Sequence, residues 1–243
     1  MSYLDKKRSR KRDLETVEST VKQHEDLRAD VLLCSRSAKF AALADLFRLV
    51  PTRLEPSIRS LMEPCPNVGP CPVTSGEFAG AAKAALAWIQ GGGDECILAE
   101  QHAVLFGETD AGGSGPCLPA RAELYLSDGF GEIERTVEAL YVEFGFAPAR
   151  AHRAPSHIVN ELEFMAYLLD RASRGDIEAW VAARDFLAAH LLPWAVVFSA
   201  ATSTRAEHPV TRYAGFMLEQ LLLCEADAVR GADLLPRVRG ATA

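Results

Sequence analysis

Residues 155–168 read Pro-Ser-His-Ile-Val-Asn-Glu-Leu-Glu-Phe-Met-Ala-Tyr-Leu, a stretch with regularly spaced apolar side chains. These side chains recur at steps of three or four residues, which is the period of an α-helix: Ile158, Leu162, Met165 and Leu169. We expect all four to face the core. Because proline is favoured in the first turn of a helix, the spacing predicts a helix from about Pro155 to Ala172.

The same period extends over most of the chain. Further helices are expected at about 27–50, 56–62, 77–90, 94–106, 131–144, 176–201 and 208–229, the one at 176–201 being bent or restarted at Pro193. No run of alternating polar and apolar residues is long enough for a sheet. The predicted fold class is therefore all-α, a compact bundle of about eight or nine helices.

Capping residues and glycines mark the expected helix ends: Thr74 with Glu77 as a capping box, Asp94 and Asp176 as N-caps, and Gly145 and Gly175 as turns that end helices. The longest irregular segment runs from 107 to 129, and we expect it to separate two helical halves. Within it, residues 122–126 fit an extended conformation.

The net charge of −7 is unevenly distributed. Residues 1–12 contain six basic residues and Asp5, which leaves 20 basic and 32 acidic residues, a charge of −12, for the remainder. An acidic body disfavours nucleic acid as the main partner and suits a basic peptide, although it also serves solubility alone. We predict a basic, flexible tail and lead-in at 1–26, one helical domain at 27–230 and a frayed tail at 231–243.

Neither a membrane span nor a secretory signal is predicted. The longest apolar run, at 187–201, contains His190 and Pro193 and is shorter than the ~20 residues that cross a bilayer. The basic N-terminus is followed by Asp13-Leu14-Glu15 instead of an apolar stretch. We therefore expect a cytoplasmic protein whose six cysteines are free thiols.

No motif indicates catalysis, metal binding or nucleotide binding. Glu100 and His102 do not have the Glu-x-x-His spacing of di-iron bundles. Cys65 and Cys71 flank a five-residue gap without a second pair nearby, which favours an ordinary loop over a zinc site. The glycines at 112–115 lack the Lys-Ser/Thr of a phosphate-binding loop. We predict no catalytic residue, no metal ligand and no cofactor.

The start of the helix at 155–172 is the strongest candidate site. Unpaired backbone amides are expected there, together with His157, Glu161 and Glu163, which fall outside the apolar stripe. A cationic histidine is disfavoured at the positive end of a helix, so His157 should be neutral or bonded to an acid. These groups form either a polar recognition patch or an ordinary exposed helix start.

Three sets of residues occur in a recognisable order. The first comprises Pro155, His157, Ile158, Glu161, Leu162, Phe164, Met165 and Leu168; the second comprises Phe186, His190, Leu191 and Trp194, followed by Phe198; the third comprises Leu105-Phe106-Gly107 and Tyr125-Leu126. Together they resemble the TorD/DmsD/NarJ family of maturation chaperones for molybdenum-cofactor oxidoreductases. The resemblance covers about residues 27–223 and implies a TorD-like helical bundle.

The resemblance implies a cytoplasmic chaperone, monomeric or homodimeric. Such a chaperone binds the twin-arginine signal peptide, or the N-terminal segment, of a molybdopterin-dependent oxidoreductase catalytic subunit and holds it until the cofactor is inserted. The implied peptide-binding residues are Pro155, Ser156, His157, Glu161, Glu163, Tyr125, Phe106 and Trp194, with the aromatic residues near the apolar wall. Ser156 stands where the family often has Asp, so the polar anchor should be His157 with Glu161, Glu163 being the alternative carboxylate.

Two alternatives of other classes stay open at this point. The chain can be a small helical enzyme whose Cys/His site is assembled only in the fold. It can also be a scaffold that docks on nucleic acid or anionic lipid through its basic tail, in which case binding should be strongly salt-sensitive.

Overall fold

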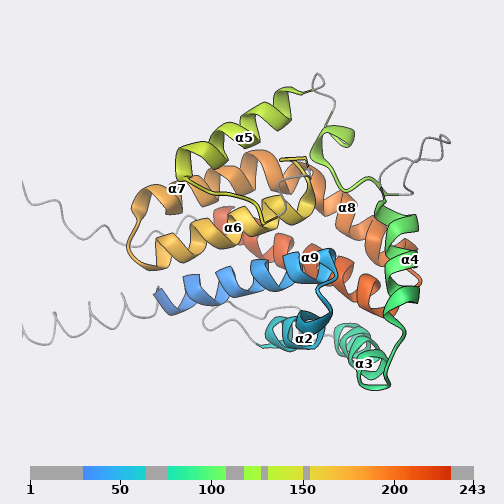
Figure 1. Cartoon of the computed structure of the whole chain (residues 1–243). Coiled ribbons are helices and arrows are strands. Elements are labelled where there is room, and N and C mark those ends of the chain that lie inside the picture. The colour runs from blue at the N-terminus through green and yellow to red at the C-terminus, as the bar shows by residue number, and fades with distance from the viewer. Residues whose placement is uncertain (1–29, 64–75, 108–117, 127–130, 150–153, 231–243) are drawn as a thin grey trace, which may run out of the picture.

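The computed structural model describes residues 30–63, 76–107, 118–126, 131–149 and 154–230. Over these residues the protein is all-α, as predicted, and contains no β-strand (Figure 1). The elements are a helix over 30–48, the 3-10 turn η1 (Pro51–Arg53), α2 (Leu54–Met62), α3 (Gly76–Gln90), α4 (Glu95–Phe106), the 3-10 turn η3 (Ala122–Leu124), α5 (Glu132–Phe144), α6 (Ile158–Ser173), α7 (Ile177–Phe186), the π-helical turn η4 (Leu187–Leu191), α8 (Leu192–Arg205) and α9 (Pro209–Arg230).

The helices pack around one continuous cluster of buried side chains, which extends from Leu33 to Leu222. In Figure 1, α5 lies along one side of the bundle, α6 and the helix over 30–48 cross its middle, and α2 and α3 lie on the opposite side. A hydrogen bond from Ser37 Oγ to the carbonyl of Ala166 (2.8 Å) joins the two middle helices.

Helices α8 and α9 form an antiparallel pair that requires a glycine at its contact. A Cβ atom added to Gly215 would lie 2.6 Å from the backbone nitrogen of Ser203 and 2.7 Å from the side chain of Thr202. Any larger residue at this position would push the two helices apart.

Helix α7 continues through η4 into α8 without a break. The amide of Leu192 donates to the carbonyl of Leu187, five residues back, and Pro193 then stands in the first turn of α8, where its missing N–H is tolerated. The predicted bend or restart at Pro193 is therefore a π-helical turn, and α8 ends at Arg205, four residues later than predicted.

Because α7, η4 and α8 form one continuous helix, the prediction that the apolar run at 187–201 is too short to span a membrane needs correction. Within the described residues, one helix, Ile177–Arg205, is 29 residues long and apolar enough to cross a bilayer by length and composition. The core helix of a soluble protein meets the same criteria. The side chains of Trp180, Phe186 and Phe198 are buried in the bundle, which accounts for much of its apolar character.

Most predicted helix ends are confirmed. Asp94 accepts from the amide of Cys96 and Asp176 from that of Ala179, and Gly145 ends α5 in the left-handed conformation with φ of 67°. Residues 122–126 were predicted as extended, but 122–124 form the turn η3. Several predictions fall outside the described residues: the Thr74 cap, Cys65, Cys71, the glycines at 112–115, the basic tail and the C-terminal tail at 231–243.

Candidate functional site

Helix α6 begins at Ile158, later than predicted, and His157 is its N-cap residue. The ring Nδ1 of His157 accepts a hydrogen bond from the amide of Val159 at 3.2 Å. A nitrogen that accepts in this way carries no proton, so the ring is neutral and the unfavourable cation at the helix start is avoided. Histidine therefore replaces the usual Ser, Thr or Asp as the cap.

The segment before α5 is tied to the start of α6 by two backbone hydrogen bonds. The amide of Ile158 donates to the carbonyl of Ala120 (2.9 Å), and the amide of Ala122 donates to the carbonyl of Ser156 (3.1 Å). This pairing places Glu123 beside Ser156, whose hydroxyl donates to Oε2 of Glu123. Ser156 is fully buried, and the Glu123 side chain is only 8% exposed.

Glu161 is completely buried one turn into α6. Its Oε2 accepts from Nε1 of Trp194 at 3.1 Å, and its Oε1 has no hydrogen-bond partner within the described residues. Burial raises the pKa of Glu161 well above its usual value; the Trp194 hydrogen bond lowers that pKa, and the nearby charge of Glu123 raises it. Glu161 was predicted to fall outside the buried face, which is wrong because α6 is covered on several sides.

Glu163 points to a different part of the surface. Its carboxylate forms an ion pair with Arg48 of the helix over 30–48 and also accepts from the amide of Ala149 at 3.4 Å. Glu163 is thus separated from Glu161, and it connects the segment after α5 to the middle of the bundle.

The predicted aromatic residues come together in one row. The ring centroid of Trp194 lies 5.5 Å from that of Tyr125 and 5.6 Å from that of Phe198, and Phe198 lies 5.5 Å from Phe106. Trp194 and Phe198 are fully buried, whereas Tyr125 and Phe106 are half-buried. Only the two ends of the row reach the surface.

A surface hollow of about 680 Å³ lies between α5 and the segment that leads to Pro155. Its walls include Glu134, Glu138, Tyr141, Val142, Phe146 and Pro155. The hydroxyl of Tyr141 donates to the carbonyl of Pro155 at 2.9 Å, and the amide of Phe146 donates to the carbonyl of Tyr141 at 2.8 Å. These bonds hold the turn after α5 against the start of α6.

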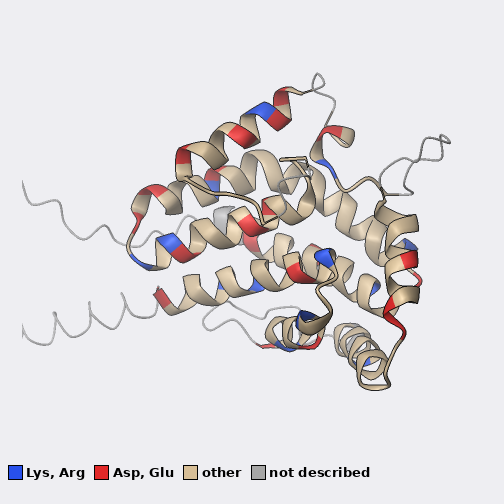
Figure 2. Cartoon of the chain, viewed as in Figure 1, with Lys and Arg blue, Asp and Glu red and all other residues tan. Residues whose placement is uncertain are grey.

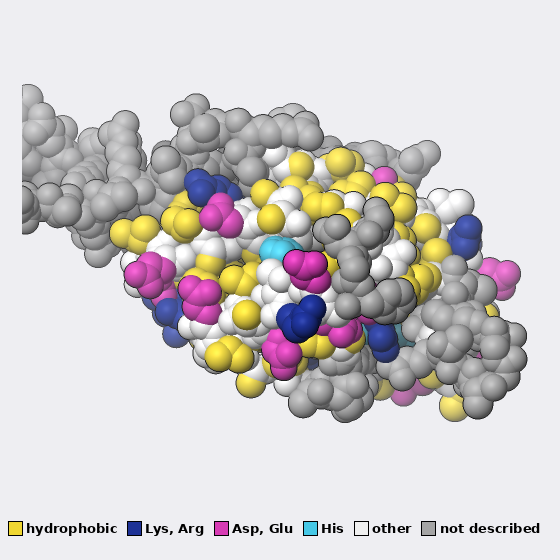
Figure 3. Space-filling view, turned by 90° about the horizontal axis from the view of Figure 1, so that it is seen from above, with side chains coloured by type: hydrophobic (Ala, Val, Ile, Leu, Met, Phe, Trp, Pro, Cys, Tyr) yellow, Lys and Arg dark blue, Asp and Glu magenta, His cyan; other side chains and the backbone are white. Residues whose placement is uncertain are grey.

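The hollow combines acidic and apolar side chains. Val142 is 76% exposed, and Glu138 is exposed one turn before it on the same face of α5. One cation, Arg135, also lines the hollow, but its Nε donates to the carbonyl of Gly131 (2.9 Å). Figure 2 shows that acidic residues predominate along α5. Figure 3 views the molecule from the side on which α5 lies, and it shows hydrophobic and acidic side chains next to each other on that face.

Sequence reasoning missed several of these residues. Glu123 lies in an irregular segment whose pairing with the start of α6 leaves no pattern in the sequence. Glu134, Glu138 and Val142 follow each other at helical spacing on α5. Val142 is the one signal that could have been noticed in the sequence, because an apolar residue there interrupts the otherwise polar face formed by Glu134 and Glu138.

Metal-binding side chains do not cluster in the described part of the chain. Within it, no group of three His, Cys, Asp or Glu side chains is placed to hold a metal ion. None of its three cysteines, Cys34, Cys96 and Cys224, forms a disulfide, as expected for that part of the chain.

A comparison with known protein families identifies the relationship. The profile of the nitrate reductase delta subunit family matches residues 83–200, a range that contains both the start of α6 and Trp194. The matched range comprises 118 of the 243 residues of the chain. Members are cytoplasmic, non-enzymatic chaperones that act with the catalytic subunits of molybdoenzymes during maturation, and the predicted relationship to TorD/DmsD/NarJ is confirmed. No curated protein matches the chain significantly.

Proposed function

We propose that this chaperone binds the twin-arginine signal peptide, or the N-terminal segment, of a molybdopterin oxidoreductase catalytic subunit in the hollow beside Pro155. It holds this segment in the cytoplasm until the cofactor is inserted. The observation that supports the proposal is the composition of the hollow, in which Glu134 and Glu138 adjoin the apolar surface of Val142 and Phe146.

The chemistry of such a peptide matches these walls. A guanidinium group forms two parallel hydrogen bonds with a carboxylate, so the paired arginines have partners in Glu134 and Glu138. The apolar stretch that follows the arginines can cover Val142 and Phe146, which otherwise remain in contact with water. The acidic body of the chain adds a long-range attraction for a basic peptide.

The residues at the start of α6 then divide into two groups. Pro155 lines the hollow, and the half-buried His157 is next to it in sequence, so both are expected to contact the peptide. Ser156, Glu161 and Trp194 have no exposed surface and are expected to position the wall from behind.

The other predicted residues border the same region. Glu163 anchors Ala149 at the edge of the hollow. The exposed parts of Tyr125 and Phe106 are available for apolar segments of the peptide that extend past the start of α6.

The test is a fluorescence anisotropy titration with a labelled synthetic peptide that carries two adjacent arginines followed by an apolar stretch. The double variant Glu134→Gln, Glu138→Gln should bind at least about tenfold more weakly, because charge-assisted hydrogen bonds contribute roughly 1.5–3 kcal/mol each. Glu143→Gln is the matched control, since Glu143 is exposed on the same helix but does not line the hollow.

Two results would contradict the proposal. Unchanged affinity in the double variant would place the site elsewhere. Equal affinity for a peptide with two glutamines in place of the arginines would show that arginine is not recognised. An independent test in the native host asks whether a molybdopterin enzyme subunit co-purifies with the chain; its absence under mild conditions would count against the function itself.

A further inference from the structure

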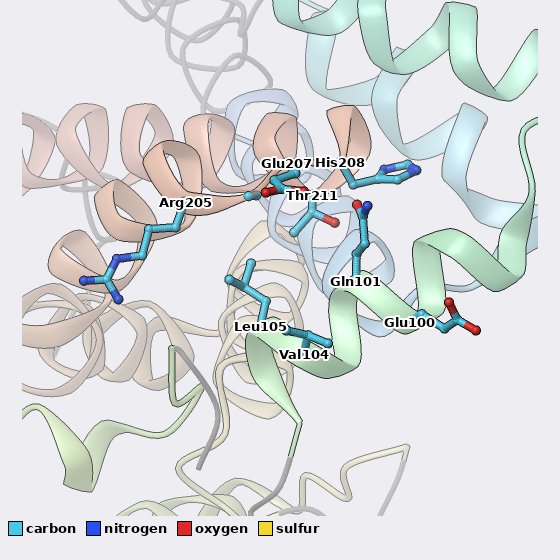
Figure 4. A pocket seen from close by; sticks show the side chains of 9 residues that line it. Glu100, Gln101, Val104, Leu105, Arg205, Glu207, His208 and Thr211 are labelled. Carbon is cyan, nitrogen blue, oxygen red and sulfur yellow. The ribbon is translucent and has the colours of Figure 1, made fainter. Parts of the chain in front are cut away.

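A second cavity, of about 470 Å³, lies between α4 and the turn that joins α8 to α9 (Figure 4). Figure 4 shows Gln101 of α4 pointing across this space toward His208 and Thr211, while Arg205 and Glu100 extend away from its centre. The cavity shares no lining residue with the hollow beside Pro155.

Three polar atoms of its lining have no hydrogen-bond partner within the described residues: Oε1 of Gln101, Nε2 of His208 and Oγ1 of Thr211. His208 and Thr211 are each only 4% exposed. Buried polar atoms are normally hydrogen-bonded, so three such atoms in one cavity indicate a place where a bound molecule supplies the partners.

The hydrogen-bonding character of each atom can be assigned. Nδ1 of His208 accepts from the amide of Val210 at 3.2 Å, and burial lowers the pKa of the ring, which favours its neutral form. The proton of the neutral ring is then on Nε2, which is a donor. Oε1 of Gln101 is an acceptor, and the Thr211 hydroxyl serves as either.

These groups are held in place by their surroundings. The ring of His208 packs edge-on against Trp88, with centroids 4.4 Å apart. Nε of Arg212 donates to the carbonyl of Ala206 at 2.9 Å, and the close contact at Gly215 fixes α8 against α9 directly behind the turn. The cavity is thus pre-organised, which lowers the entropy lost on binding.

The three unpartnered groups are uncharged and offer a donor, an acceptor and a hydroxyl. A carboxamide presents the complementary set, a carbonyl oxygen and an NH₂ group, on one planar unit. The three unpartnered groups carry no charge that could neutralise a charged ligand group, so such a group would be disfavoured in direct contact with them. We propose that this cavity binds the carboxamide side chain of an Asn or Gln residue in a peptide segment of the client protein.

Two observations favour a peptide as the source of this group. Glu100 and Glu207 line the cavity, with Arg205 as the only Lys or Arg among its lining residues, and this suits basic residues that flank the amide. Leu105 of the lining directly precedes Phe106, an end of the aromatic row. The charge of Arg205 also acts on Tyr125 at the other end of that row, by lowering a pKa that burial raises. This inference rests on the proposed function, because it adds a second contact for the same class of client.

The inference is tested by NMR with ¹⁵N-labelled protein, in which the Nε2–H signal of His208 reports on the cavity. The probe is the peptide acetyl-Lys-Gln-Leu-Lys-amide, and the matched control is acetyl-Lys-Leu-Leu-Lys-amide. We expect a saturable shift of the His208 signal with the Gln peptide and an affinity for the Leu peptide that is about tenfold lower. Equal affinities for the two peptides, or no saturable shift, would overturn the inference.

A pair of protein variants separates recognition from folding. Thr211→Val keeps the shape of the side chain and removes a buried hydroxyl without a partner, so the variant should fold with an unchanged or raised Tm. Its affinity for the Gln peptide should fall about fivefold, whereas Thr204→Val, at an exposed position of α8 outside the cavity, should bind normally. Wild-type affinity in Thr211→Val would overturn the inference.

The two proposals fail in distinguishable ways. If the Gln probe does not bind while the twin-arginine peptide binds beside Pro155, the inference is overturned and the proposed function stands. If the probe binds while the twin-arginine peptide does not, the cavity is a carboxamide site and the proposed function is overturned. Glu134→Gln with Glu138→Gln should leave the affinity of the probe unchanged, because neither residue lines this cavity.

Discussion

Trp194 donates its indole N–H to Oε2 of Glu161 at 3.1 Å, and both side chains are fully buried. The two residues come from α6 and α8, and each belongs to one of the motifs that connect the chain to its family. A buried carboxyl with a single donor is costly when ionised. The pair therefore makes the stability of the protein sensitive to pH.

Replacing Glu161 by glutamine should stabilise the protein at neutral pH. The pKa of Glu161 is raised above its usual 4.5 in the folded state, so the folded protein binds this proton more tightly than the unfolded chain does. The contribution of protonated Glu161 to the free energy of unfolding is fully present below about pH 4.5. It is lost as the pH rises toward the pKa of Glu161 in the folded state. Glutamine stays neutral and still accepts from Trp194.

Thermal unfolding of wild type and Glu161→Gln from pH 4 to pH 8 checks this expectation. The two Tm values should be similar near pH 4 and diverge above it. The free energies of unfolding should then differ by roughly 1.4 kcal/mol for each unit by which the pKa of Glu161 is raised. A variant that is less stable than wild type at pH 8 would show that Glu161 is ionised and well compensated in the fold.

Ser156→Asp should destabilise the protein at neutral pH. In this chain the Ser156 hydroxyl donates to Glu123, so an aspartate would place two buried carboxylates together. We expect a loss of about 1–3 kcal/mol in the free energy of unfolding, measured by urea titration. Adding Glu123→Gln should recover much of it; no recovery would show that the two side chains do not interact.

Gly215→Ala should destabilise the α8–α9 pair by about 1–3 kcal/mol, because its Cβ would lie 2.6 Å from the backbone nitrogen of Ser203. Gly80→Ala is the matched control, since a Cβ at Gly80 in α3 meets nothing within 4 Å. That substitution should stabilise the protein by about 0.5–1 kcal/mol. Equal effects of the two substitutions in urea unfolding would contradict the close contact between α8 and α9.

Glu225→Gln should be strongly destabilising. Glu225 of α9 pairs with Arg36 through two hydrogen bonds, and the side chains are 5% and 6% exposed. Removing one partner leaves a buried charge uncompensated, at a cost of about 3–5 kcal/mol. The double variant Arg36→Met, Glu225→Leu should lose less than Glu225→Gln alone. A larger loss of unfolding free energy in the double variant would show that the Arg36–Glu225 pair itself stabilises the fold.

The sequence by itself determined the helical class and most helix ends. Periodicity is a local property, and so is capping: the side chains of Asp94 and Asp176 reach amides two or three residues away. The family relationship was also visible, because its motifs are short ordered strings on α6 and on the helix from α7 to α8.

Only the tertiary structure decided how the candidate site is composed. Glu161 changed from an expected surface carboxylate to a buried one, because α8 brings Trp194 over it. Glu123 reaches Ser156 through the pairing of residues 120–122 with the start of α6. The three unpartnered atoms at Gln101, His208 and Thr211 meet across two helices. Such contacts depend on how helices pack against one another. The periodicity of one helix does not show which helices pack against it.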